Sequence, residues 1–394
     1  MRDVLGPGTI LGYCTNVHAG PTLEAVQANL ATHAVAVREH LGLTSALGIG
    51  LWLAAPAARA LRDPIALRRF ADWLAARDLE VFTINGFPYG DFHEPVVKHR
   101  VYEPNWTRPE RLAYTLDLLH VLAGLRPDGG EGSISTLPLG WPVAIDDDAA
   151  TQAAAGALRT FTDEAARVEL DTGRHIHLDL EPEPGCRLER SADVVAFFTD
   201  HLLAGVSNPA RVLRHVQVCH DVCHAAVMFE PQADAIAAYA ENGIAIGKVQ
   251  LSSALRVPFE ELDPAARRAA LRSLREFAED RYLHQTTRRH AGSGAPEFDE
   301  DLPDALAALG QRDPAGEWRV HFHVPLDAET LTPLATTQDD VRVCLERLRG
   351  GAVRHFEVET YAWNVLPPAW RPDDLAAGIA RELAWVRDHA TPVA

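Results

Sequence analysis

Three carboxylates at the ends of strand-like segments are the residues of this 394-residue sequence best suited to metal chemistry. Glu181, Asp221 and Glu359 each end a short segment in which apolar and polar residues alternate. Successive residues of a strand point to opposite faces, so each carboxylate shares its face with the polar residues two and four positions before it. Carboxylates that converge in a buried place need a cation, and a divalent metal ion is the usual one. The pattern therefore predicts a metal site.

Histidines gather beside these carboxylates. Eight of the 18 histidines fall within the four windows 174–181, 215–224, 318–324 and 353–360. Five neighbouring strand candidates carry polar residues on one face. These residues are His177, Asp179 and Glu181; Gln217, Cys219 and Asp221; Lys248, Gln250 and Ser252; Arg319, His321 and His323; His355, Glu357 and Glu359.

The elements that position these residues alternate between short strands and longer helices along the whole chain. Strands are predicted at 9–16, 46–53, 79–85, 132–136, 174–181, 212–221, 244–252, 318–324 and 353–360. A first helix has Leu23, Val26, Leu30 and Val37 on one face with Thr22 as its N-cap, and further helices are predicted after Thr107, Ser191 and Thr337. Such alternation is typical of parallel strands joined by right-handed crossovers.

We predict an α/β fold, a single (β/α)8 TIM barrel over 1–394 with long loop insertions at its C-terminal face. There are nine strand candidates for eight places, so we expect either 244–252 or 318–324 to lie outside the barrel. The insertions are expected near 85–106 and 284–317, with a loop at 285–304. The first is rich in aromatic residues, and we interpret it either as a loop packed on the rim or as a pocket wall that carries Phe87, Tyr89, Phe92, His93, Lys98 and Tyr102.

Composition excludes several classes of partner. The formal net charge of −18 argues against a nucleic-acid surface and against a polybasic membrane patch. The five cysteines form no paired framework, the N-terminus has no secretion-signal pattern, and no uncharged segment is long enough to span a bilayer, so we expect a soluble cytoplasmic protein with no membrane insertion. Cys219, His220, Cys223 and His224 do not have the spacing of a zinc knuckle, and no phosphate-binding loop or nucleophile elbow is present.

Three short segments resemble the xylose isomerase-like TIM-barrel superfamily, which contains sugar isomerases, keto-sugar epimerases and endonuclease IV. Asp221-Val-Cys-His224 resembles the D-T-C-H segment of that superfamily, Leu178-Asp-Leu-Glu181 the end of its fifth strand and Phe356-Glu-Val-Glu359 the end of its eighth. Four further segments are similar to the EboE-type metabolite traffic proteins: NGFPYG (85–90), SISTLPLG (133–140), LEPEPGC (180–186) and HFHVP (321–325).

The resemblance implies one divalent ion, Mn2+, Mg2+ or Zn2+, held by Glu181, Asp221 and Glu359. The histidine that ends strand seven in the related epimerases is matched here by Gln250, so either Gln250 or a histidine of 321–323, preferably His323, completes the ligand set. His224 is then a ligand or a substrate contact. Endonuclease IV also needs histidines after strands three and four, where this chain has Asn85 and Thr136, which argues against a DNA-repair nuclease.

The leading functional hypothesis is a metal-dependent isomerase or epimerase that acts on a sugar-like polyol or hydroxy-ketone in a metabolite biosynthesis or export pathway. Glu181 and Glu359 serve as base and acid, and either Lys248 or a histidine stabilises the enediolate oxygen. The residues expected to bind substrate are His224, His321, His177, Asn85, Tyr89, His93, Trp141 and Trp363.

Two alternatives remain open, a metal-dependent hydrolase and a non-catalytic protein that binds and transfers a metabolite. All three hypotheses share a small-molecule partner and exclude nucleic acid. A homodimer is the assembly we consider.

Overall fold

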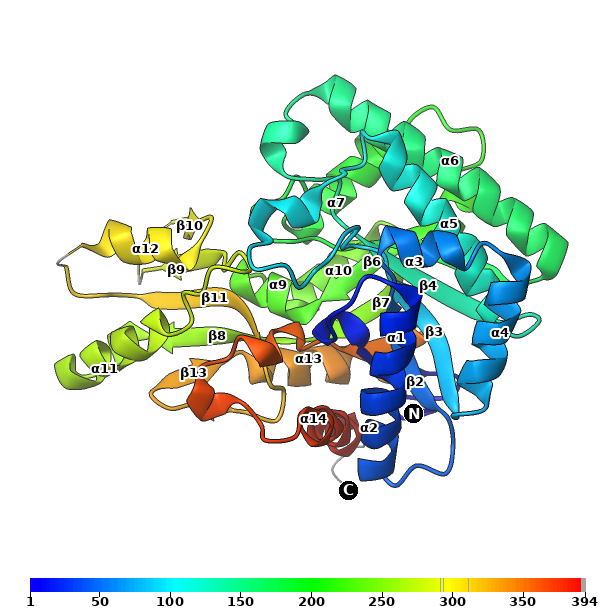
Figure 1. Cartoon of the computed structure of the whole chain (residues 1–394). Coiled ribbons are helices and arrows are strands. Elements are labelled where there is room, and N and C mark those ends of the chain that lie inside the picture. The colour runs from blue at the N-terminus through cyan, green and yellow to red at the C-terminus, as the bar shows by residue number, and fades with distance from the viewer. Residues whose placement is uncertain (291, 293, 311, 391–394) are drawn as a thin grey trace.

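Eight parallel strands close a barrel in the computed structural model, which describes residues 1–290, 292, 294–310 and 312–390 (Figure 1). Around the barrel the order is β1-β14-β7-β6-β5-β4-β3-β2, with every neighbouring pair parallel. The strands are β1 (Ile10–Cys14), β2 (Leu47–Trp52), β3 (Leu79–Asn85), β4 (Glu131–Thr136), β5 (His175–Leu180), β6 (Val216–Asp221), β7 (Ile246–Leu251) and β14 (His355–Val358). The predicted (β/α)8 barrel is confirmed.

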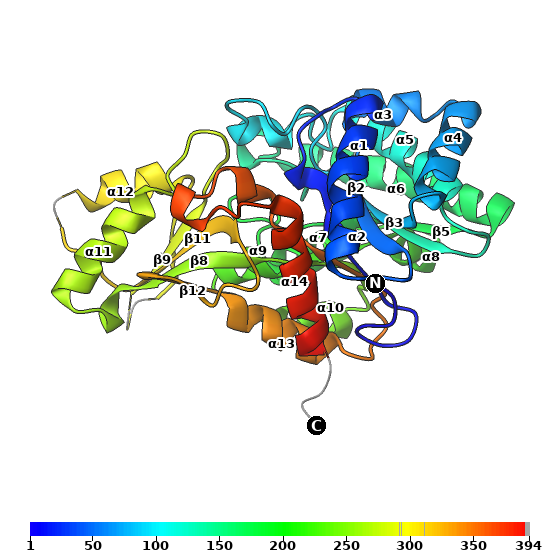
Figure 2. The ribbon, with the colours of Figure 1, turned by 60° about the horizontal axis from the view of Figure 1, so that its bottom comes forward.

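Helices cover the outside of the barrel (Figures 1 and 2). They are α1 (Leu23–Asn29), α2 (Val35–His40), α3 (Ala55–Ala60), α4 (Pro64–Ala75), α5 (Pro109–Leu125), α6 (Asp148–Thr172), α7 (Ser191–Phe197), α8 (Pro209–His215), α9 (Val222–Val227), α10 (Gln232–Glu241), α13 (Gln338–Leu348) and α14 (Leu375–Ala390). The barrel strands are buried almost throughout, since their apolar residues pack on the helices while their polar residues face the interior.

Helix starts follow the sequence only in part. The Thr22 hydroxyl accepts a hydrogen bond from the Ala25 backbone N–H, which confirms the predicted cap of α1. The start predicted after Thr107 is one residue early, because α5 begins at Pro109 and has Arg108 at its N-cap. The Thr337 hydroxyl, at the N-cap of α13, accepts a hydrogen bond from the Ala254 N–H and none from its own helix. This bond connects the start of α13 to the segment that follows β7.

The strand predicted at 212–221 is wrong in its first part. Residues 212–215 form the last turn of α8, and β6 begins only at Val216. The Asn208 side chain accepts from the Arg211 N–H, and Pro209 occupies the first turn of the helix. Both features favour a helix start, and they outweigh the β-like alternation of the four residues that follow.

The part of the chain between β7 and α13 forms a second sheet, which extends to one side of the barrel (Figures 1 and 2). Its strands are antiparallel, in the order β10-β9-β11-β8-β13-β12. They are β8 (Ser253–Pro258), β9 (Thr286–Arg289), β10 (Glu297–Asp299), β11 (Glu317–Val324), β12 (Thr330–Leu331) and β13 (Leu334–Thr336), accompanied by helices α11 (Pro264–Arg275) and α12 (Leu302–Leu309).

This sheet decides which strand candidate lies outside the barrel. The segment 318–324 is β11 of the second sheet, and 244–252 contains the barrel strand β7. The polar faces predicted to lie on five neighbouring barrel strands therefore belong to four barrel strands and to β11. The insertion starts at Ser253, much earlier than 284, and the loop expected at 285–304 contains β9, β10 and the start of α12.

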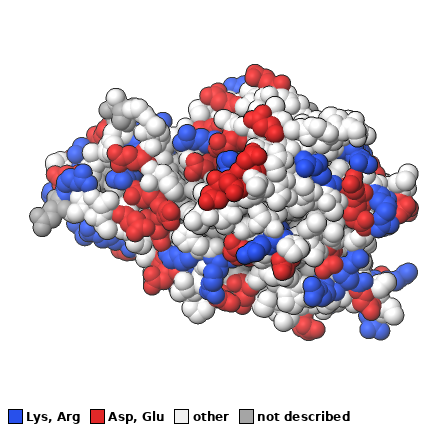
Figure 3. Space-filling view, turned by 90° about the horizontal axis from the view of Figure 1, so that it is seen from above, with Lys and Arg blue, Asp and Glu red and all other residues white. Residues whose placement is uncertain are grey.

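Surface charge is mixed. On the face shown in Figure 3, Asp and Glu side chains interleave with Lys and Arg and leave no continuous basic area. Over the part of the chain that the structure describes, no helix is long and apolar enough to cross a membrane.

Candidate metal centre and substrate pocket

Glu181, Asp221 and Glu359 meet at the C-terminal rim of the barrel. Glu181 and Glu359 directly follow the ends of β5 and β14, and Asp221 is the last residue of β6. One carboxylate oxygen of each lies within 4.8 Å of the other two, and all three side chains are buried. The ends of parallel strands share one rim of the barrel, which is why residues up to 178 positions apart in sequence come together here.

The electrostatics of this cluster favour a bound cation. Burial raises the pKa of Glu181 to about 8. Burial, followed by the charges of Glu181 and Asp221, raises the pKa of Glu359 well above its usual range. Burial alone would raise the pKa of Asp221 too, but His224 and His323 lower it. A divalent cation would compensate the negative charge of this cluster, so fewer of its carboxylates need a proton.

One oxygen of Asp221 is available for such a cation. Asp221 Oδ1 accepts hydrogen bonds from the His224 backbone N–H (2.9 Å) and the Ser252 hydroxyl (2.7 Å). Asp221 Oδ2 is buried and has no hydrogen-bond partner among the described residues. An unpartnered buried carboxylate oxygen is costly, so the residues present fit a divalent metal ion.

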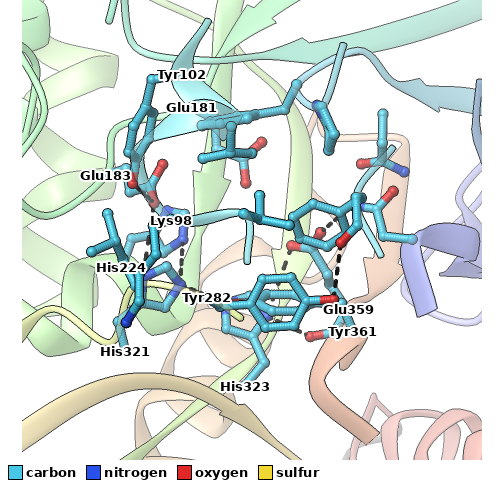
Figure 4. Close-up of a pocket in the computed structure, with 18 residues that line it drawn as sticks. Lys98, Tyr102, Glu181, Glu183, His224, Tyr282, His321, His323, Glu359 and Tyr361 are labelled. Carbon is cyan, nitrogen blue, oxygen red and sulfur yellow. Dashed lines mark hydrogen bonds and ion pairs between the residues drawn. The ribbon is translucent and has the colours of Figure 1, made fainter. Parts of the chain in front are cut away.

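Three histidines border the carboxylates. His224 lies on α9, and His321 and His323 lie on β11 of the second sheet. His323 Nε2 is 4.0 Å from Asp221 Oδ2, and His323 Nδ1 is 3.9 Å from Glu359 Oε2. The second sheet thus supplies two imidazoles to a site that begins on the barrel, and Figure 4 shows both beside the ring of His224.

A cavity opens beside Glu181 and Glu359 (Figure 4). Its walls contain Phe87, Phe92, Lys98 and Tyr102 from the loop after β3, and Tyr282 and Leu283 from the insertion after β7. Its other lining residues are Asn16, Asn85, Pro88, Val97, Val101, Glu181, Glu183, His224, His321, His323, Glu359 and Tyr361. The mixture of aromatic walls and a few polar groups is typical of ligand pockets.

The two insertions hold each other in place over this cavity. The Arg281 carbonyl accepts from the backbone N–H groups of Val97 (2.7 Å) and Lys98 (3.0 Å). The Tyr282 hydroxyl donates to the Phe92 carbonyl at 3.2 Å, and Lys98 forms an ion pair with Asp301. The wall of the pocket is therefore shared between two segments that are remote in sequence.

The remaining predicted site residues lie outside the pocket lining. Lys248 and Gln250 lie in the barrel interior, where Lys248 Nζ pairs with Glu357 Oε2 at 2.5 Å. The Gln250 amide is within hydrogen-bond distance of Asn85 and Glu357, so it is already engaged with these two residues. His177, also in the interior, contacts Asp179 Oδ1 at 2.7 Å.

Four aromatic side chains that were predicted to bind substrate contact other residues of the protein instead. Tyr89 packs edge to face on Tyr114, and His93 Nε2 contacts the Asn16 carbonyl at 2.6 Å. Trp141 packs on Tyr102, behind the pocket wall, and the Trp363 indole N–H donates to Glu382. Sequence position placed these residues on the correct loops but could not show which way their side chains turn.

Several residues that line the pocket were not predicted from the sequence. Glu183 follows Glu181 by two positions, and its Oε1 accepts from the Tyr102 hydroxyl (2.7 Å) and the Gln285 amide (3.2 Å). Tyr361 follows Glu359 by two positions, and Asn16 donates to Glu359 Oε1 at 3.1 Å. The signal available for Glu183 and Tyr361 was their place just beyond a strand end, where the loops of a barrel line the site.

Comparisons with known proteins show the fold. No protein-family model matches the chain, and no curated protein matches it. A xylose isomerase-like TIM-barrel protein from Mycobacterium smegmatis, solved in complex with magnesium, is 15% identical with a TM-score of 0.53, and the match covers 99% of each chain. A probable 3-DHS dehydratase, AsbF, from Bacillus anthracis is 10% identical with a TM-score of 0.47, covering 95% of this chain and 97% of that one.

The IolI protein, solved with a bound zinc atom, is 11% identical with a TM-score of 0.45, covering 98% of this chain and 100% of that one. At such low identity these likenesses describe the backbone arrangement alone. The chain has the fold of the xylose isomerase-like TIM barrels.

Proposed function

We propose that this protein is a divalent-metal-dependent isomerase or epimerase that acts on a sugar-like polyol or hydroxy-ketone. The observation that carries the proposal is the buried group of Glu181, Asp221 and Glu359, two of which, Glu181 and Glu359, line a cavity. Glu181, Asp221 and Glu359 hold the ion, and His323 supplies an imidazole to the same centre. A bound divalent ion polarises the carbonyl of a hydroxy-ketone and stabilises the negative charge that develops when an α-proton leaves.

The two glutamates are placed to move that proton. β5 and β14 are three positions apart in the eight-stranded barrel, so Glu181 and Glu359 approach the cavity from different sides. Neither oxygen of Glu181 has a hydrogen bond with a described residue, whereas Glu359 Oε1 accepts from Asn16 Nδ2. We assign Glu181 as the base that takes the proton and Glu359 as the acid that returns one, because an unbonded carboxylate accepts a proton more readily than one already hydrogen-bonded.

The walls provide binding and exclude water. Phe87, Phe92 and Leu283 present apolar surface, and the side chains of Tyr282 and Tyr361 stack edge to face at 5.1 Å between ring centroids. Lys98, whose ammonium group is paired with Asp301, also lines the cavity. A polyol carbon chain fits such a wall while its oxygens face the carboxylates below.

Two further points support the proposal. The similar protein from Mycobacterium smegmatis was solved with magnesium, and Mg2+ or Mn2+ suits the oxygen donors of the three carboxylates. The segments that resemble EboE-type proteins include Asn85, Phe87, Glu183, His321 and His323, all of which line the cavity. On that basis we place the reaction in the handling of a secondary metabolite.

Hydrogen exchange tests the proposal directly. The metal-loaded full chain is incubated in D2O with a panel of ketoses and hydroxy-ketones, and deuterium at the carbon next to the carbonyl is followed by NMR. We expect exchange with at least one compound, and a loss of about 10²-fold or more in Glu181→Gln. Glu241→Gln, on the surface helix α10, serves as the control and should exchange like the wild type.

The results separate catalysis from metabolite binding. Exchange that survives in Glu181→Gln would contradict the assigned base. Full metal occupancy without exchange on any compound, together with a small molecule that co-purifies unchanged, would replace the isomerase with a metabolite-binding protein.

A further inference from the structure

A buried carboxylate on α14 joins two segments that lead away from the candidate metal centre. Glu382 Oε1 accepts hydrogen bonds from the Leu326 backbone N–H (3.0 Å) and the Thr360 hydroxyl (2.5 Å). Its other oxygen, Oε2, accepts from the Trp363 indole N–H at 3.2 Å. Leu326 follows β11, whereas Thr360 and Trp363 follow β14. One side chain thus bonds to the segment after a strand of the second sheet and to the segment after a barrel strand.

The carboxyl group of Glu382 is costly where it lies. It is buried, and the three groups that bond to it are neutral donors. Burial raises its pKa to about 8, although the bonds from Thr360 and Leu326 act in the opposite direction. A carboxyl group buried without a cation costs free energy that an apolar side chain of the same size would not. Its contribution to the protein therefore lies in the groups that it holds.

Those groups lie close in the chain to two members of the metal centre. Thr360 directly follows Glu359, and Leu326 lies three residues after His323. His323 Nδ1 contacts the Glu359 carbonyl at 2.8 Å. A carbonyl oxygen only accepts, so the neutral imidazole donates from Nδ1 and carries its lone pair on Nε2. The direction in which His323 Nε2 points therefore depends on where the Glu359 backbone lies.

Strand pairing does not set the position of His323 relative to Glu359. β14 pairs with β1 and β7 in the barrel, and β11 pairs with β8 and β9 in the second sheet. The chain that leaves β11 is fixed by side chains instead, since Leu326 donates its N–H to Glu382 and accepts at its carbonyl from the Gln338 amide. Glu382 is the group that also bonds to the chain leaving β14.

We propose that Glu382 is a positioning residue, which holds the His323 imidazole and the Glu359 carboxylate at the spacing that the metal ion needs. The inference rests on the proposed function, in which both residues belong to the metal centre. His323 Nδ1 and Glu359 Oε2 lie 3.9 Å apart. Without the bonds to Glu382, the segments after β11 and β14 would move more independently, and the ion would lose part of its fixed surroundings.

The same bonds fix one wall of the cavity. Tyr361 lies between Thr360 and Trp363 in the chain, and it lines the cavity. The centroid of its ring is 4.7 Å from that of His323. A change at Glu382 is therefore expected to reach the metal centre and the wall beside it together.

The ring of His323 reports on this contact in the metal-free full chain. 15N NMR of the histidine side chains distinguishes a ring protonated at Nδ1 from one that exchanges between its two neutral forms, and a His323→Gln variant identifies the signal. We expect the Nδ1-protonated form in the wild type, because the Glu359 carbonyl accepts from it. We expect a mixture of the two forms in Glu382→Gln, since glutamine has one acceptor oxygen where glutamate has two and cannot accept from all three donors.

Mn2+ affinity tests the positioning itself. The dissociation constant of the full chain is measured by competition with a chelator, and each variant is also unfolded in urea. We expect binding about 10-fold weaker in Glu382→Gln, as is typical when a group that supports metal ligands is changed. Thr360→Val removes the donor next to Glu359 with little change of shape, and it should weaken binding in the same direction.

Glu80→Gln is the matched control. The Glu80 carboxylate accepts from Arg126 Nη1 at 3.0 Å near the start of β3, at the end of the barrel opposite to the site. This variant should lose stability and still bind Mn2+ like the wild type. It separates the positioning of the metal centre from a general loss of stability.

A Glu382→Gln protein that keeps the wild-type His323 signal or the wild-type Mn2+ affinity would overturn the inference, as would an equal loss of affinity in Glu80→Gln. If Glu382→Gln does not fold, the same two measurements on Thr360→Val decide. Deuterium exchange by the wild type together with an unchanged Glu382→Gln would leave the proposed function in place and remove the role of Glu382. If the wild type binds no Mn2+, the proposed function fails, and the His323 signal alone decides whether Glu382 holds the contact.

Discussion

Glu357→Gln is the change that best tests how the interior of the barrel is stabilised. Glu357 and Lys248 are both fully buried and face each other at 2.5 Å. Lys248 Nζ also donates to Asn85 Oδ1 at 2.7 Å and to the Ser135 hydroxyl at 3.3 Å, while Glu357 Oε1 accepts from Asn85 Nδ2 at 2.9 Å. Glutamine keeps the shape of the side chain but removes the negative charge and replaces one of the two acceptor oxygens with a donor NH2 group.

The expected loss follows from the charge left behind. Burial alone would lower the pKa of Lys248, but the Glu357 carboxylate raises it above its usual range, so the ammonium is charged in the native protein. Removing one partner of a buried pair costs about 3–5 kcal/mol, because the other charge stays buried without compensation. With a urea slope on the order of 3 kcal/mol/M, the unfolding midpoint should fall by about 1–1.7 M.

A double-mutant cycle measures the pair itself. Lys248→Met and the double variant are unfolded in urea beside Glu357→Gln and the wild type. We expect the double variant to be more stable than the sum of the two single losses predicts, since it contains no uncompensated buried charge. Asp327→Asn, which breaks the exposed pair with Arg381, is the control and should move the midpoint little.

The reasoning would be refuted if Glu357→Gln shifted the urea midpoint no more than the Asp327→Asn control. It would also fail if the two single losses were additive. A Lys248→Met protein that is stable but has lost proton exchange would instead support the catalytic role assigned to Lys248 from the sequence.

Two further predictions concern residues in the interior of the barrel. Burial alone would lower the pKa of His177, but Asp179 raises it to about 9. The stabilisation that this pair provides is complete below the unfolded pKa of about 6.5 and is lost as pH rises through 9. The Tm should therefore fall between pH 6.5 and 9.5, and an equal fall in His177→Gln would contradict this. In Gly50→Ala the new Cβ would lie 1.2 Å from Glu357 Oε1, and we expect a loss of at least about 3 kcal/mol in unfolding experiments. Gly156→Ala, in an open helix position, should gain about 1 kcal/mol, and equal effects of the two changes would refute the clash.

The carboxylate positions could be predicted because they depend on local pattern. In β5, the alternation of Ile176, Leu178 and Leu180 with His177 and Asp179 indicates a strand with one apolar face, and Glu181 then falls at its end. Parallel barrel strands end at one rim, so a strand-end carboxylate is near the other strand ends without knowledge of side-chain contacts. The same local pattern failed at 212–215, where the Asn208 and Pro209 helix signals are stronger than the alternation.

The local pattern of the sequence could not predict which residues the side chains of Lys248 and Gln250 contact. Both alternate toward the interior, as predicted, but depth along the strand decides whether an interior residue faces the cavity or a buried partner. Glu357 and Asn85 come from other strands and engage both side chains below the rim. Pairing across the barrel is set by register between strands, which no single strand encodes.

Residues close together in the chain are enough to specify the alternation of strands and helices, the closed parallel barrel that follows from it, and the three carboxylates at the strand ends. Folding in three dimensions was needed to show that β11 leaves the barrel and brings His321 and His323 back to Asp221 and His224. That contact joins residues about a hundred positions apart and depends on how the second sheet packs against the barrel rim. Periodicity carries no information about such packing, so the histidine side of the centre became visible only once the chain was folded.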